Sequence, residues 1–249
     1  MKIISLNCWG GRLSPDLLEF VRTRSATTDV FCFQEVFRET DATGPLPPFH
    51  PTGDHALFER LVAVLSDFEG RFSASYGSRY GLATFVRKKI GIVSDTTAFV
   101  FRDGPDEPLE SGLEGEHARS VFVVRLGNGI RVANFHGLWR KGTGKDDLPE
   151  RIEQSNRMMG AFDREEGPIA VLGDFNLNPN TESIAVFERA GFRNLIKEKG
   201  VRSTRTHHFD PRWSPYADYA LVRGVAVRDF AVLPDAVSDH APLLLEIEA

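Results

Sequence analysis

Residues 169–176 read Ile169-Ala170-Val171-Leu172-Gly173-Asp174-Phe175-Asn176, an apolar run that ends in an acid and an amide. A short apolar run that contains β-branched residues and is followed by glycine predicts a β-strand, here over residues 168–173. Asp174 and Asn176 then lie at the carboxyl end of this strand or just past it. Polar side chains held at the end of a rigid strand are typical of a binding or catalytic site at the edge of a sheet.

The same arrangement of an apolar run followed by a polar side chain recurs along the chain. Three further residues come directly after such runs: Asn7, Glu35 and His136. Three others lie at or near the beginning of predicted strands: Asp218, Asp239 and His240. In a mixed sheet an antiparallel strand begins on the rim where its neighbours end. All of these side chains can therefore converge on one edge of the predicted sheets.

Each of these residues, taken alone, also has a purely structural explanation. Glu35 can be a turn or cap residue, and Asp174 with Asn176 can form an Asx-type turn. Asp239-His240 can be a helix cap or a paired core histidine. The convergence of several polar residues on one rim is what favours a functional site over these explanations.

Strands outnumber helices in the predicted elements. Strands are expected over residues 2–7, 29–34, 81–87, 90–101, 119–126, 129–135, 168–173, 217–223, 225–232 and 240–247, and helices over 15–27, 54–68, 148–163 and 181–191. Gly127-Asn128-Gly129 predicts a hairpin turn, and Thr181 is a candidate helix cap. Direct strand-to-strand connections between 81 and 135, and again from 217 onward, imply antiparallel pairing. The pattern therefore predicts an α/β fold in which two mixed sheets pack face to face under outer helices.

The composition is that of an ordinary globular protein, with 41% hydrophobic and 26% charged residues in 249 positions. A chain this long and this apolar can bury a large core, which excludes disorder as its main state. The formal net charge of −5 argues against a protein that coats nucleic acid non-specifically. It does not exclude an enzyme that acts on nucleic acid, because net charge says nothing about a local patch.

The cysteines and the first residues bear on where the protein works. Cys8 and Cys32 both lie in apolar stretches, and we expect free, buried, reduced thiols. The first residues predict a core strand and lack the features of a signal peptide. No apolar run approaches the roughly 20 residues that span a bilayer. We therefore expect a cytoplasmic protein without stable membrane insertion, and by default a monomer.

Six short blocks of this sequence resemble, in order, those of the endonuclease/exonuclease/phosphatase superfamily. They are Leu6-Asn7-Cys8-Trp9-Gly10, Gln34-Glu35-Val36, Asn134-Phe135-His136, Gly173-Asp174-Phe175-Asn176, Ala217-Asp218-Tyr219 and Ser238-Asp239-His240. The resemblance covers residues 3–247. It implies a single catalytic domain over 1–249, a four-layer α/β sandwich, and Mg²⁺-dependent hydrolysis of phosphate esters.

Hydrolysis of an anionic phosphate ester needs charge neutralisation and a positioned water. Glu35 is the first choice for a metal ligand, because a hard carboxylate oxygen suits Mg²⁺, for which Mn²⁺ is a possible substitute. Asn7 offers a neutral oxygen to the same ion or to one of its waters, and the resemblance supports both assignments. Asp239 resembles a family residue near the metal. Whether one or two ions act stays open.

The resemblance also assigns the catalytic groups. Asp174 would orient and deprotonate the attacking water, and Asn176 would hold that water or a phosphate oxygen. His240 would donate to a non-bridging oxygen, with Asp218 as the carboxylate that fixes its tautomer. His136 would donate to the phosphate or protonate the leaving oxygen.

Several other residues have functional and structural explanations side by side. His207-His208 beside Asp210 could form a second metal site, although a solvated loop is the simpler explanation. The following could line the catalytic rim or serve turns, loops and packing: Gly10-Gly11-Arg12, Arg119, Arg140-Lys141, Trp139 and Trp213. The predicted rim loops span 102–117 and 140–148.

The substrate class stays open at the level of sequence. A phosphodiesterase or nuclease is the first expectation, which makes nucleic acid a possible partner. The first block, with Trp9 after Cys8, is similar to that of neutral sphingomyelinase-like members. A phosphomonoesterase or lipid-headgroup hydrolase that uses the same residues is the alternative, and a non-catalytic module that binds phosphate ligands is a third.

Overall fold

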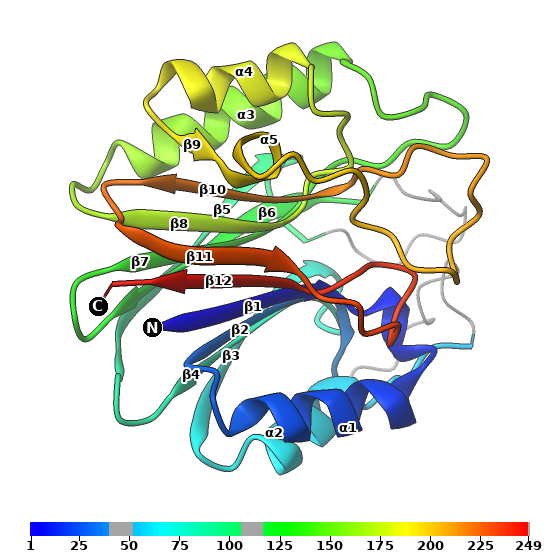
Figure 1. The fold of residues 1–249 in the computed structure, drawn as a ribbon, viewed down its shortest axis with the longest axis vertical. Helices are drawn as coiled ribbons and strands as arrows, with labels where there is room; N and C mark the ends of the chain where they lie inside the picture. The colour runs from blue at the N-terminus through cyan, green and yellow to red at the C-terminus, as the bar shows by residue number, and fades with distance from the viewer. Residues whose placement is uncertain (40–51, 106–116, 249) are drawn as a thin grey trace.

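The computed structural model describes residues 1–39, 52–105 and 117–248, which form two mixed six-stranded sheets packed face to face (Figure 1). The first sheet has the order β11 (Val227–Val232), β12 (Leu243–Ile247), β1 (Lys2–Asn7), β2 (Val30–Phe37), β4 (Tyr80–Arg87) and β3 (Phe68–Tyr76). The second has the order β5 (Ile92–Phe101), β6 (Arg119–Leu126), β7 (Arg131–His136), β8 (Ile169–Asp174), β10 (Asp218–Arg223) and β9 (Arg193–Asn194). The β1–β2 and β7–β8 pairs are parallel, and the other pairs are antiparallel.

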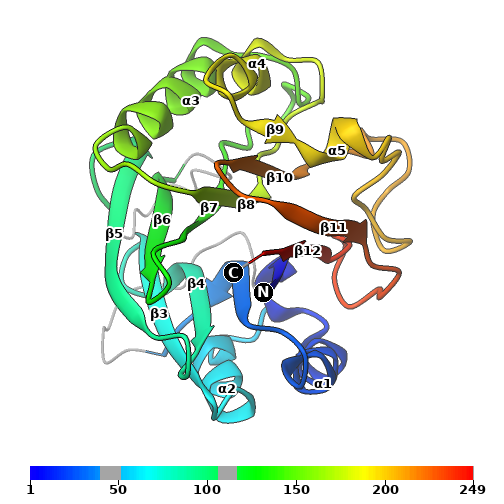
Figure 2. The same ribbon diagram turned by 60° about the vertical axis from the view of Figure 1, so that its left-hand side comes forward.

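Helices cover the outer face of each sheet and complete the four-layer α/β sandwich. Figures 1 and 2 show α1 (Ser14–Ser25) and α2 (Leu57–Val64) against the first sheet. On the second sheet lie α3 (Pro149–Phe162), α4 (Glu182–Arg189) and the short α5 (Leu195–Glu198). A 3₁₀ turn, η1 (Trp9–Gly11), follows β1. In the described part of the chain no helix is both long and apolar enough to cross a bilayer.

The alternation of side chains along β1 and β2 explains how one strand serves two cores. Ile3 and Val30 point into the core between the sheets, whereas their neighbours Ile4 and Phe31 pack under α1 and α2. Successive side chains of a strand point to opposite faces, so a strand buried on both faces is apolar throughout. The apolar runs predicted as strands are therefore interior strands of a sandwich.

The predicted two-sheet architecture is confirmed, with differences in three elements. β3 was not expected, because the helix predicted over 54–68 includes the residue at which this strand begins. The alternation of Phe68, Gly70 and Phe72 has the period of a strand. The two-residue β9 and the one-turn α5 are too short to leave a periodic signal. Of the predicted rim loop 102–117, residues 106–116 lie outside the described residues.

Two local predictions are confirmed in detail. The segment Gly127-Asn128-Gly129 connects the antiparallel strands β6 and β7, and Gly129 has a φ of 85°. Thr181 caps α4, since its Oγ1 accepts from the backbone N–H of Ile184 at 3.4 Å. Both features act within a few residues, which is why local sequence chemistry predicts them.

Gly173 allows β7 and β8 to approach each other next to Asp174. It has a φ of 148°, and a Cβ atom at this position would overlap the carbonyl oxygen of Phe135. We expect Gly173→Ala to destabilise the fold by about 3–5 kcal/mol, because both the strand spacing and the backbone angle would have to change. The midpoint of urea unfolding measures the effect.

Gly160 provides the matched control for this substitution. It lies on the exposed side of α3, and a Cβ there would meet nothing within 4 Å. Gly160→Ala should leave stability unchanged or raise it by up to about 1 kcal/mol, since alanine favours a helix over glycine. Equal stability of the two variants would contradict this role of Gly173.

Cys8 and Cys32 are free and buried, as expected. Burial raises the pKa of Cys32 to about 12 and raises that of Cys8 well above its usual value. Only the thiolate reacts readily with a disulfide reagent. We therefore expect the folded protein to react slowly with Ellman's reagent at pH 8, and both thiols to react at once in guanidinium. Immediate release of two equivalents from the folded protein would contradict this burial.

Candidate active site

The register of the second sheet places three of the predicted residues side by side. His136 ends β7 and is paired with Asp174 at the end of β8, and Asp174 is paired with Asp218 at the start of β10. Residues directly opposite on adjacent strands point to the same face. The predicted meeting of strand ends with the start of an antiparallel strand is therefore what the structure shows.

Asn7 joins the first sheet to this row. Its Nδ2 donates to Asp174 Oδ2 at 3.0 Å and to Glu35 Oε1 at 3.1 Å. His136 Nε2 lies 3.7 Å from Glu35 Oε1 and 3.8 Å from Asp174 Oδ2. The Oδ1 of Asn7 accepts from the backbone N–H of Trp9, so the amide nitrogen faces the two carboxylates. One amide thereby connects carboxylates from both sheets.

Glu35 does not follow its strand, as the sequence suggests, but lies within β2. The strand continues to Phe37, and its pairing with β4 shifts between Phe33 and Val36. Glu35 itself has a φ of 58°, a left-handed conformation that costs energy for a residue with a side chain. A bulge of this kind redirects one side chain without ending the strand, which explains how Glu35 reaches the rim.

Buried amides tie the two sheets together beneath this bulge. Asn134 Nδ2 on β7 donates to the carbonyl oxygens of Phe33 and Ala83 at 3.0 Å each, across the space between the sheets. Gln34 Nε2 donates back to Asn134 Oδ1 at 2.7 Å. No role could be predicted for these amides, because the sequence around a polar residue in an apolar strand does not show which residue of another strand it contacts. They fix the position of β2 next to Glu35.

His240 and Asp218 form a buried pair. The His240 Nδ1 lies 2.8 and 2.9 Å from the two Asp218 oxygens, and Thr204 Oγ1 donates to Asp218 Oδ2 at 2.8 Å. Burial raises the pKa of Asp218 and lowers that of His240, because it disfavours the charged form of each. This arrangement leaves His240 Nε2 facing Asp174 Oδ2 at 3.6 Å.

Asp174 is the central carboxylate of the cluster. Its Oδ2 faces Asn7, His136 and His240, and its Oδ1 accepts from the backbone N–H of Asn176 at 2.8 Å. Asn176 has a φ of 54°, and its Nδ2 donates to the Gly137 carbonyl at 3.4 Å. The Asx-type turn considered from the sequence is thus present, and it holds Asp174 in the cluster rather than replacing a functional role.

Asp239 lies on the His240 side of the cleft, where it binds an arginine that the sequence analysis missed. Arg205 Nη1 donates to Asp239 Oδ2 at 3.1 Å, while Asp239 Oδ1 lies 3.9 Å from His240 Nε2. Lys145 is also buried nearby, and burial lowers its pKa to about 8. Both cations come from loops without periodicity, so no local pattern marks them.

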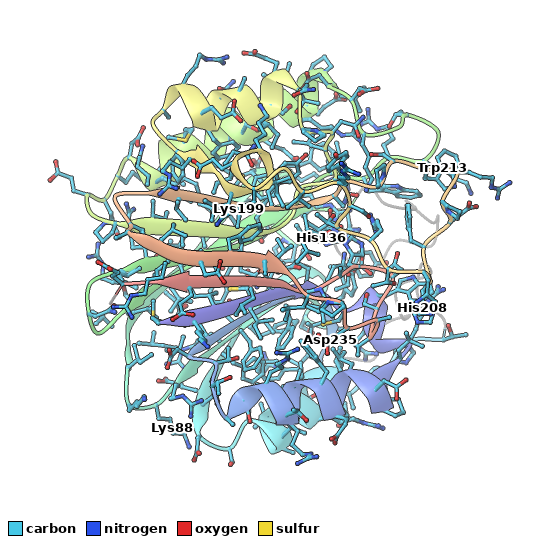
Figure 3. All side chains as sticks on the ribbon, viewed as in Figure 1. Lys88, His136, Lys199, His208, Trp213 and Asp235 are labelled. Atoms are coloured by element: carbon cyan, nitrogen blue, oxygen red, sulfur yellow. The ribbon has the colours of Figure 1, made fainter. Side chains whose placement is uncertain are left out.

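Most of these residues line a cleft of about 310 Å³, although Asn7, Lys145 and Asp218 are not part of its wall. Its wall includes Glu35, Asp174, Asn176, Asp239 and His240, together with Arg12, Arg119, Arg205, His117, His136, Tyr80, Trp9, Trp139 and Phe209. Figure 3 shows His136 on the side of the molecule that carries the loop of His208 and Trp213. Trp213 is 61% exposed and lines a neighbouring groove rather than the core.

The other candidates from the sequence are not part of the carboxylate cluster. The His207 and His208 rings lie 4.1 Å apart and tilted by 40° in an exposed loop, and Asp210 pairs with Arg212. Arg140 binds Glu150, and Lys141 is exposed. Arg12 and Arg119 both reach the cleft. Among the described residues, one group of acids and histidines brings its ligand atoms within 4.8 Å of one another: Asp174, Asp218 and His240.

The donor set fits a hard divalent cation. Glu35 and Asp174 are two carboxylates that accept from one neutral amide, and they are buried enough that their combined charge is poorly screened. Oxygen donors of this kind suit Mg²⁺. In the Asp174, Asp218 and His240 group, both Asp218 oxygens already face His240 Nδ1. The Glu35 side of the cleft is therefore the better place for an ion, while the Asn7 Nδ2 that faces it orients the two carboxylates.

Comparisons with known proteins agree with this geometry. A sequence model described as the Endonuclease/Exonuclease/phosphatase family matches residues 4–240. No curated protein sequence matches the chain significantly. Among solved structures, a mannosyl-6-phosphatase from Bacteroides thetaiotaomicron is 18% identical with a TM-score of 0.72, and all of each chain is covered.

Two further structures have the same fold. A Bacteroides vulgatus protein described as an endonuclease/exonuclease/phosphatase is 17% identical, covers 99% of this chain and 98% of its own, and has a TM-score of 0.71. The catalytic domain of human nocturnin is 17% identical, covers 100% of this chain and 93% of its own, and has a TM-score of 0.65. At such low identity these structures establish the fold.

Proposed function

Because the chain belongs to the endonuclease/exonuclease/phosphatase family, we propose that it is a Mg²⁺-dependent hydrolase of phosphate esters. The observation that carries the proposal is the environment of Asp174. This buried carboxylate faces two imidazoles, His136 Nε2 at 3.8 Å and His240 Nε2 at 3.6 Å, and an amide of the opposite sheet. A carboxylate between two potential proton donors suits general acid–base chemistry.

Glu35 would hold the metal ion, and Asn7 would join it through Oδ1 once its amide has turned about χ2, because Nδ2 is the atom that faces the carboxylates here. When bound, such an ion supplies charge neutralisation for the phosphate and lowers the pKa of a nearby water. The left-handed backbone at Glu35 supports this role, because strained conformations persist where the surrounding structure requires one side-chain direction.

The remaining residues would divide the work of an in-line displacement. Asp174 orients the attacking water and accepts its proton, and Asn176 holds the water or a phosphate oxygen. His240 donates its Nδ1–H to Asp218, so its Nε2 would donate to a non-bridging oxygen in the imidazolium form, which the nearby carboxylates of Asp239 and Asp174 favour. His136 donates to the phosphate or to the leaving oxygen. Because these groups are preorganised by the strands, little reorganisation is needed at the moment of reaction.

We propose a phosphodiester as the substrate, and a phosphomonoester as the second candidate. The second is supported by three cleft arginines, Arg12, Arg119 and Arg205, because guanidinium groups bind a dianionic terminal phosphate well. The Bacteroides thetaiotaomicron protein of the same fold is described as a mannosyl-6-phosphatase. The diester is favoured by the groove beside Trp213, which shares Arg205 and Phe209 with the cleft and would receive a second ester group.

Turnover of two aryl substrates tests this proposal. With Mg²⁺ present, kcat/KM for bis(para-nitrophenyl) phosphate should exceed kcat/KM for para-nitrophenyl phosphate. Glu35→Gln should abolish the turnover that Mg²⁺ supports. The reverse ratio would establish the monoesterase. If neither ester nor any other phosphate ester is hydrolysed, the chain is a binding module and the proposal is wrong.

A further inference from the structure

Arg205 is held in the cleft from several directions. Its guanidinium lies 4.1 Å above the ring of Phe209, and its Nη1 is 3.1 Å from Asp239 Oδ2. The side chains of Arg205 and Asp239 are 7% and 13% exposed. An ion pair this deeply placed is poorly screened by solvent, and removal of one partner would leave a buried charge uncompensated.

The backbone around Arg205 is tied to the segment that carries His240. Arg205 and His240 form an isolated antiparallel bridge. On either side, the Thr206 N–H donates to the Asp239 carbonyl at 3.2 Å and the Ala241 N–H donates to the Thr204 carbonyl at 2.9 Å. The guanidinium is therefore a fixed cation of the cleft and not a surface side chain that happens to reach it.

The position of this cation determines where a divalent ion can bind. The cleft has carboxylates on two sides. Glu35 and Asp174, joined by the Asn7 amide, form the first side, and Asp239, next to the His240 ring, forms the second. Arg205 already neutralises the second side. A divalent ion placed at Asp239 would have to displace the guanidinium or lie beside it, and two cations a few ångströms apart in a buried site repel each other strongly.

We propose that Arg205 takes the place of a second divalent cation at Asp239, so that the cleft binds a single ion, at Glu35. This inference rests on the proposed metal-dependent function. It reassigns Asp239 from the metal-binding role expected from sequence to the role of a carboxylate partner of Arg205. Arg205 is thus a charge-compensating residue specific to this side of the cleft.

The number of bound ions tests the inference directly. Mn²⁺ serves as the probe, with stoichiometry from isothermal titration calorimetry and from the loss of the free-ion signal in electron paramagnetic resonance. We expect one ion per chain for the wild type and for Arg205→Lys, which keeps the charge. We expect two ions for Arg205→Ala, with the second bound more weakly, and one ion again for Arg205→Ala combined with Asp239→Asn. The exposed Arg212 provides the control, since Arg212→Ala should leave one ion.

The outcomes separate this inference from the proposed function. Two ions in the wild type, or one ion in folded Arg205→Ala, overturn the inference and leave metal dependence intact. No ion in the wild type contradicts both. If Arg205→Ala does not fold, the Asp239→Asn variant provides the test. We expect it to bind one ion with a Kd within threefold of the wild type, and a loss of affinity of tenfold or more would overturn the inference.

Discussion

Replacement of Asp174 by asparagine is expected to lower kcat by about 10³- to 10⁴-fold, the upper part of the roughly 10²- to 10⁴-fold range by which a positioned general base accelerates a reaction. The substitution keeps the shape of the side chain but removes the group that accepts the proton of the attacking water. It also places an amide beside His136 and His240, which face Asp174 Oδ2 at 3.8 and 3.6 Å. Steady-state kinetics with the preferred phosphate ester measures the loss.

Asp103→Asn is the matched control for this substitution, because the Asp103 side chain is fully exposed, at 100%, and lies outside the cleft. It should retain the activity of the wild type. The thermal unfolding midpoint of Asp174→Asn should remain high enough for the variant to be folded under assay conditions. Activity of a folded Asp174→Asn variant within threefold of the wild type would refute the assigned role of Asp174.

Replacement of His240 by alanine has the second largest expected effect, a loss of about 10²- to 10⁴-fold in kcat. The imidazole is held by Asp218 at 2.8 Å and is almost fully buried. The alanine variant therefore loses a donor whose direction the protein fixes, and a mobile water would not reproduce that direction. The loss should appear mainly in kcat, since the contact with the phosphate strengthens as charge develops in the transition state.

His208 offers a comparison for the same substitution on the same side of the molecule. It is exposed on the side of the molecule that also carries Trp213 (Figure 3), and its ring contacts His207 and the Ala236 carbonyl. His208→Ala should change kcat/KM less than threefold. Equal losses in the two variants would show that general destabilisation of this rim, rather than chemistry at His240, causes the effect.

The elements that build the site could be predicted because their signals are local. The run from Ile169 to Leu172 is apolar at every position, as expected of a strand buried on both faces, and Asp174 ends it. Pairing rules for a mixed sheet then bring Asp174, His136 and Asp218 to one rim without any knowledge of the structure.

Features that depend on contacts between distant segments could not be predicted. The strand after Gln34 does not end, because a bulge in β2 and the buried amide of Asn134 redirect Glu35 in the middle of the strand. Arg205 comes from a loop of polar residues, and only its pairing with the segment of Asp239 and His240 brings it into the cleft. No periodicity or motif in the sequence predicts contacts between such distant segments.

The resemblance to the family and the structure support each other at different levels. The six blocks are short, and a single acid or histidine after a strand can always be a turn or cap residue. The structure places the residues of these blocks in contact across two sheets, with Asn7 of β1 bound to Asp174 of β8. A chance occurrence of the blocks would not require this convergence.

The most direct test of metal-dependent phosphate ester hydrolysis is one assay of the purified chain with and without chelator. A panel of aryl diesters, aryl monoesters, oligonucleotides and lipid headgroup esters is incubated with Mg²⁺, with EDTA, and with EDTA followed by excess Mg²⁺. We expect that at least one ester is hydrolysed with Mg²⁺, that EDTA stops the reaction, and that added Mg²⁺ restores it. Hydrolysis that is indifferent to EDTA, or no hydrolysis of any ester with Mg²⁺ or Mn²⁺, would contradict it.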